Sequence, residues 1–284
     1  MEGHLVLADE RLHDASSEHP SHQPLFRTVK PVSGAAGVMS VILLETAVGG
    51  AVVMWAGGVW GVVRKGFFVL TGVFLALCAA GAWAIAGGES STVNTALAAF
   101  TGLLVAWQVL LLIGQESLSR WVGLAAAVAG AASLPAYATL REAAVGRGVA
   151  ELVLGSIFLG SAFYGLLLGH WYLVERRLSK DYMIRSAWWF VAGTVMSIGA
   201  AILSAQNPVP SDATQFSPFL QTANFTVLLA GGLVAICAVI AGFLIRLSNE
   251  GGKSIQAATG YFYLAVIMAF SAELATKFRF FVEG

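Results

Sequence analysis

Eight long apolar stretches recur through most of this 284-residue chain and constrain its fold more than any other feature. A helix needs about 20 apolar residues to cross roughly 30 Å of hydrocarbon. We place the stretches at residues 35–60, 66–86, 93–114, 121–140, 149–174, 187–205, 219–245 and 257–276. Water is absent from the bilayer core, so such segments must be helices or strands of a closed barrel, and the alternation typical of barrel strands is not present. The sequence therefore predicts an all-α, polytopic bundle of about eight transmembrane helices.

Composition agrees with this fold class and restricts the partners. Hydrophobic residues make up 57% of the chain and charged residues 11%, which is not the balance of a soluble globular domain. The 16 basic and 16 acidic residues give zero net charge, so nothing draws the chain as a whole toward nucleic acid. We expect the lipid bilayer as a partner and no nucleic acid.

The chain divides into two regions by composition. Residues 35–284 form the predicted transmembrane domain, and residues 1–34 are polar, which predicts a disordered tail or a docking arm. Most of the chain's histidines lie in this tail, but their spacing matches no set of metal ligands, so no metal site is expected.

Charge in the loops predicts the orientation. Eight crossings put both termini on one side, here called side A, with the loops after the second, fourth and sixth segments, and the other loops lie on side B. Basic residues gather in the side B loops, which makes side B cytoplasmic by the positive-inside rule. We expect an integral protein of the bacterial inner (plasma) membrane with both termini on the outer side.

Three glutamates, Glu45, Glu151 and Glu273, fall in the half of the predicted domain next to side A. A charged side chain at the bilayer centre costs roughly 2.5–3.5 kcal/mol on insertion scales, so such residues usually handle protons, ions or polar ligands. Glu45 lies deepest, about 15 Å from side A at 1.5 Å per residue. Glu151 opens its predicted segment, where the helix dipole and water would stabilise it, so we interpret it as structural.

Glu45 and Glu273 are the candidate catalytic residues. Glu45 has no basic residue within one helical turn, whereas Glu273 lies four residues before Lys277 and can pair with it on one helix face. Tyr137, Asn224 and Lys277 fall at a similar height, and we predict that they bind a ligand there.

His170 is the remaining candidate for cofactor binding and lies toward side B. It could serve as a single axial ligand, a proton relay or a hydrogen-bond partner at a second quinone site, or simply belong to an interfacial aromatic belt with Trp171 and Tyr172. The predicted spans contain no second histidine, which excludes a bis-histidine haem within the chain.

Residues 41–50 (VILLETAVGG), the long second apolar stretch and residues 272–281 (AELATKFRFF) resemble the membrane anchor subunits of DMSO reductase and polysulfide reductase, the DmsC and NrfD group. The resemblance implies about eight helices, both termini outside, no haem, and a quinone site near the outer face. It also implies that electrons pass between the quinone and a partner iron–sulfur subunit. We expect an iron–sulfur or haem-bearing redox subunit as the partner. Glu45 and Glu273 fall where that group has small and acidic residues near its quinol pocket.

Together these observations predict a quinol- or quinone-binding subunit of a multi-subunit oxidoreductase, and they predict no independent hydrolytic or nucleotide chemistry. Glu45 would accept a proton from the quinol, Tyr137 or Asn224 would bond its second oxygen, and Glu273 with Lys277 would pass protons to water. Two alternatives remain open, namely a proton-coupled small-solute transporter and a non-catalytic accessory subunit of a respiratory or photosynthetic complex.

Overall fold

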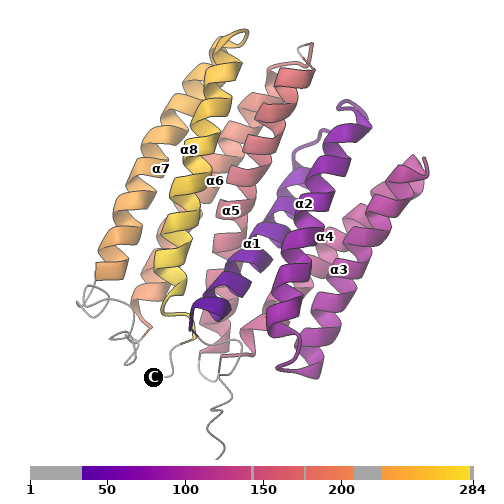
Figure 1. Ribbon diagram of the computed structural model, residues 1–284. Helices are drawn as coiled ribbons and strands as arrows, with labels where there is room; N and C mark the ends of the chain where they lie inside the picture. The colour runs from indigo at the N-terminus through magenta and orange to yellow at the C-terminus, as the bar shows by residue number, and fades with distance from the viewer. Residues whose placement is uncertain (1–33, 142–143, 176, 208–224, 282–284) are drawn as a thin grey trace, which may run out of the picture. The chain divides into compact units, whose positions relative to one another are not determined.

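The protein is an all-helical membrane bundle, as the sequence predicts (Figure 1). The computed structural model describes residues 34–141, 144–175, 177–207 and 225–281, and these contain helices and turns but no strands. The helices are α1 (Gly34–Ala56), α2 (Lys65–Ala86), α3 (Ser91–Leu112), α4 (Glu116–Ala138), α5 (Val145–Val174), α6 (Asp181–Ala205), α7 (Phe225–Glu250) and α8 (Ser254–Lys277). The predicted tail, residues 1–34, lies outside the described residues except for Gly34.

All eight helices are long and apolar enough to cross a membrane. Many of them carry large apolar side chains on their outer surfaces, such as Leu77, Leu112 and Leu228, each more than 60% exposed. In water these side chains would be a liability, but in a bilayer they contact lipid. The protein is therefore an integral membrane protein that contacts the lipid bilayer.

Helices α1 and α5 form the centre of the bundle. In the most apolar window of α1, 83% of the residues are buried, and in that of α5 67%, against 33–44% in the other six helices. Helix α1 contacts α2, α4, α5 and α8, while α3 with α4 and α7 with α8 flank this centre (Figure 1). A polar residue on the inner faces of α1 or α5 is therefore shielded from lipid by other helices.

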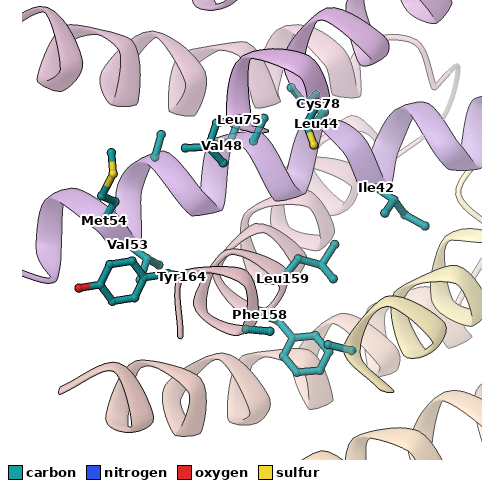
Figure 2. Close-up of a cluster of buried hydrophobic side chains, with 14 of the residues drawn as sticks. Ile42, Leu44, Val48, Val53, Met54, Leu75, Cys78, Phe158, Leu159 and Tyr164 are labelled. Carbon is teal, nitrogen blue, oxygen red and sulfur yellow. The ribbon is translucent and has the colours of Figure 1, made fainter. Parts of the chain in front are cut away.

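Glycine allows the two central helices to touch along their backbones. A Cβ atom at Gly49 of α1 would lie 1.7 Å from the carbonyl oxygen of Ser156, and one at Gly160 of α5 would lie 2.1 Å from the backbone of Gly49. Small residues at helix contacts of membrane proteins serve this close approach. On its other faces α1 presents larger side chains, and Figure 2 shows Leu44 and Val48 on the side that carries α2.

Two helix ends differ from the predicted ones in ways that matter for the polar residues. Helix α1 ends at Ala56 rather than at residue 60, because Gly58 and Gly61 adopt positive φ angles of 67° and 79° and form a turn. Helix α5 begins at Val145 rather than at residue 149, so Glu151 lies in its second turn instead of its first. This earlier start carries Glu151 away from the helix end.

Contacts at the helix ends confirm that the chain alternates between two sides. At side A the ends of α6 and α8 meet where Ser204 Oγ donates a hydrogen bond to the carbonyl oxygen of Thr276 at 2.5 Å. At side B, Arg185 near the start of α6 donates to the carbonyl oxygen of Gly57 just after α1 at 2.8 Å. Which side faces the cytoplasm stays a prediction from the loop charges.

The α1–α5 contact predicts a sharp difference between two glycine substitutions. Gly49→Ala should destabilise the bundle by about 3 kcal/mol, the top of the usual range for overpacked cores, because the atoms in its way belong to the backbone. Gly102→Ala in α3 is the matched control, since no atom lies within 4 Å of its Cβ position. Thermal denaturation in detergent measures the stability of each purified variant. Equal stabilities of Gly49→Ala and Gly102→Ala would contradict the close packing.

Candidate functional site

The side A half of the bundle contains a buried cluster of ionised side chains, here called the side A cluster. Its members come from three helices and from two segments that follow a helix, and they are Glu45 of α1, Arg141 after α4, Glu151 of α5, Asn207 after α6, and Glu273 and Lys277 of α8. Each of these side chains is at most 7% exposed. The three glutamates that the sequence placed at similar height are thus brought into one site.

Lys277 joins three helices through one ammonium group. Its Nζ lies 2.8 Å from Oε1 of Glu45 and 3.4 Å from Oε2 of Glu273, and it donates a hydrogen bond of 3.0 Å to the backbone carbonyl oxygen of Glu151. The three oxygen atoms lie on α1, α8 and α5, so one ammonium group contacts all three helices. The predicted pair of Glu273 and Lys277 is therefore present, but Lys277 lies closer to Glu45.

A second set of contacts surrounds Glu151. Nη1 of Arg141 lies 3.2 Å from Oε1 of Glu151, and Nδ2 of Asn207 donates to both carboxylate oxygens at 3.1 and 3.3 Å. Arg141 also donates to Oδ1 of Asn207 at 2.9 Å, and its guanidinium group lies over the ring of Phe280. The interpretation of Glu151 as a hydrated residue at a helix start is wrong, because α5 begins earlier and the carboxylate is 0% exposed.

Glycine creates the space that Glu45 occupies. A Cβ atom at Gly155 of α5 would lie 2.5 Å from Oε1 of Glu45. The carboxylate therefore lies against the α5 backbone with Lys277 beside it, and it is 0% exposed. Among the described residues neither carboxylate oxygen has a hydrogen-bond partner, and Oε1 has the ion-pair contact with Lys277 while Oε2 does not. A buried carboxylate oxygen without a partner is unusual and leaves Glu45 with a free acceptor.

Charges in the side A cluster do not balance. Three carboxylates form ion pairs with two cations, Arg141 and Lys277, so the ion-paired set carries one excess negative charge when all five groups are ionised. Arg279, just beyond α8, is also buried, but no ion pair joins it to these carboxylates in the described part of the chain. An uncompensated charge away from water is costly, so the cluster favours a state in which one carboxylate holds a proton.

The remaining predicted site residues lie in different places. Tyr137 is buried at the side A end of α4 and donates a hydrogen bond of 2.9 Å to Oγ of Ser40, five residues before Glu45 on α1. His170 is exposed near the side B end of α5, away from the cluster. Asn224 lies outside the described residues.

Arg141 and Asn207 are the two cluster members that the sequence did not suggest. Both follow the last turn of a helix, and a residue in a short loop is normally expected to be hydrated. One signal was available for Arg141, because the side A loops between helices contain very few basic residues. Nothing in the sequence around Asn207 distinguishes it from an ordinary polar loop residue.

Comparisons of the chain with protein-family models, with characterised proteins and with solved structures find no match. The resemblance to the anchors of DMSO reductase and polysulfide reductase stays a prediction from residues 41–50 and 272–281. The chemistry of the site is therefore argued from the contacts described above.

The charge count predicts unequal effects for the two partners of one ion pair. Lys277→Met should lower stability by about 3–5 kcal/mol, because it leaves three buried carboxylates with Arg141 alone. Glu45→Gln should cost about 1 kcal/mol or less, because two carboxylates then remain with two cations. Thermal denaturation in detergent measures both variants, with Lys253→Met on the exposed side B surface as the control. Equal losses for Lys277→Met and Glu45→Gln would contradict the charge count.

Proposed function

We propose that this protein is a quinol-linked membrane subunit in which the side A cluster takes a proton from the quinol and passes it toward side A. The electrons would leave to an iron–sulfur or haem-bearing partner subunit. The observation that carries the proposal is the state of Glu45, a fully buried carboxylate with one oxygen beside Lys277 and the other without a partner among the described residues. Intramembrane ionisable groups of this kind are functional sites by default.

The excess negative charge supports a role in proton transfer. A set of three carboxylates and two cations can alternate between a net charge of minus one and zero by gaining or losing one proton. When Glu45 holds the proton its ion pair with Lys277 is lost, but Lys277 keeps Glu273 and Arg141 keeps Glu151. Glu45 is the member with a free acceptor, so it is the residue proposed to receive the proton. Glu273 shares Lys277 with Glu45 and lies four residues before the side A end of α8. This position suits a group that passes the proton on toward side A.

The hydrogen-bonded hydroxyl groups of Tyr137 and Ser40 offer a binding position for the quinol headgroup. Tyr137 donates to Ser40, and Ser40 donates to the carbonyl oxygen of Ala82 at 3.2 Å, so the phenol oxygen of Tyr137 can still accept a hydrogen bond. A quinol hydroxyl could supply that bond from between the side A ends of α1 and α4, two helices that pack together. Glu45 is enclosed by Gly155 and Lys277, so proton transfer would require its side chain to turn toward the headgroup.

Replacing Glu45 by glutamine tests the proposal. Glu45→Gln should lower turnover of a short-chain quinol analogue by about 100-fold or more, the usual minimum for loss of a general base. The assay uses the complex purified intact from membranes of the host, with its partner subunits attached. Glu250→Gln is the matched control, because Glu250 is an exposed glutamate at the side B end of α7. Unchanged turnover in Glu45→Gln would rule out the assignment.

Gly155→Ala provides a second test in which the glutamate remains. The added methyl group would meet the Glu45 carboxylate, which is the mobile end of a side chain and can move away. Turnover should fall in this variant while the protein keeps its fold. If the wild-type complex oxidises no quinol, and the protein in liposomes instead accumulates a solute in a proton- and Glu45-dependent way, the transporter alternative replaces the quinol proposal.

A further inference from the structure

A second polar site lies at the opposite end of the bundle, where four helix ends meet. A pocket of about 260 Å³ opens there between the turn after α1, the start of α2, the end of α3 and the start of α4. Its walls include residues 60–65, Phe68, Leu111, Glu116 and Arg120. It lies among helix ends at side B, whereas the side A cluster lies at the other ends of α1 and α4.

Positive charge dominates the walls of this side B pocket. Arg64, Lys65 and Arg120 line it, against a single carboxylate, Glu116, which leaves a formal excess of two positive charges. Arg64 has one weak partner outside the pocket, Glu175 at 3.4 Å, and its side chain is 81% exposed. Lys65 donates one hydrogen bond, to the carbonyl oxygen of Leu112 at 3.3 Å, and each of the three cations has more N–H groups than partners among the described residues.

Two helix N-termini add to the positive potential. Helix α2 begins at Lys65 and helix α4 at Glu116, and both residues line the pocket. Neither preceding residue, Arg64 or Gln115, caps its helix with a side-chain hydrogen bond. The first backbone N–H groups of a helix without such a cap, together with the helix dipole, favour an anion.

Trp60 contributes a further hydrogen-bond donor at the wall of the pocket. Its ring is stacked on Phe68 with centroids 4.2 Å apart, so its orientation is fixed. Its indole N–H is buried and has no acceptor among the described residues, although Trp60 lines the pocket. A buried indole N–H normally has an acceptor, and an oxygen of a bound anion would supply one.

We propose that the side B pocket binds a phosphate group carried by an anionic ligand at the membrane surface. Arg64, Lys65 and Arg120 would contact the phosphate oxygens, and Trp60 would donate to one of them. The pocket lies among the ends of four transmembrane helices, and basic pockets in this position bind anionic headgroups. A phospholipid headgroup and a free phosphate-bearing solute share this chemistry and are the two possible sources.

Titration of the full-length protein in a zwitterionic detergent tests this inference. Short-chain phosphatidylglycerol, phosphatidylcholine and inorganic phosphate are added separately at low ionic strength, and tryptophan fluorescence and Tm are followed. Phosphatidylglycerol should bind and raise Tm, and phosphatidylcholine should not. The Kd for phosphatidylglycerol should rise at least tenfold in the triple variant that combines Arg64→Gln, Lys65→Gln and Arg120→Gln. All three residues are exposed, so this variant should keep its fold.

Two further variants distinguish specific binding from general charge. Trp60→Phe keeps the stacked ring but removes the N–H donor, and it should weaken binding severalfold. Arg246→Gln with Lys253→Gln removes two exposed side B charges outside the pocket and should leave the Kd unchanged. Variant-sensitive binding of phosphatidylglycerol alone identifies a lipid, and equally sensitive binding of inorganic phosphate identifies a solute site. Equal binding of both lipids, or a triple variant that binds like the wild type, would overturn the proposal.

Discussion

The buried ammonium group of Lys277 is the interaction on which the side A half of the bundle depends. It joins carboxylates of α1 and α8 and the backbone of α5, and these three helices pack against one another. Removing a lysine from water is costly, and the cost is offset only when each of its donors has an acceptor. The arrangement therefore fixes the relative positions of three helices and places Glu45 in surroundings where its charge has one partner.

The same geometry requires the glycines of α1 and α5. Gly49 and Gly160 bring the two backbones into contact, and Gly155, between Glu151 and Gly160 on α5, provides the room that the Glu45 carboxylate needs. With a larger residue at Gly155 the carboxylate could not lie against α5 beside Lys277. Packing and electrostatics are thus parts of one arrangement, since the close helix contact brings the charges together and the ion pairs hold the helices in place.

Much of the fold follows from the sequence, but only part of the site does. Eight crossings and the gathering of Glu45, Glu151 and Glu273 could be predicted, because the length of apolar stretches and the alternation between two sides depend on local sequence alone. The contacts of Glu151 could not be predicted, because they depend on where α5 begins and on Arg141 and Asn207 in neighbouring loops. The end of α1 was also misplaced, because apolar residues continue past the glycine turn.

The distance along the chain between Glu45 and Lys277 has a consequence for biosynthesis. Glu45 enters the bilayer with α1, while Lys277, the cation paired with it in the described part of the chain, arrives with α8. During the synthesis of the six helices between them the carboxylate has no counterion, so it must stay protonated or remain in contact with water. The bundle can therefore close around Glu45 only after α8 has been inserted. The insertion of α8 is thus the step that fixes the final position of α1.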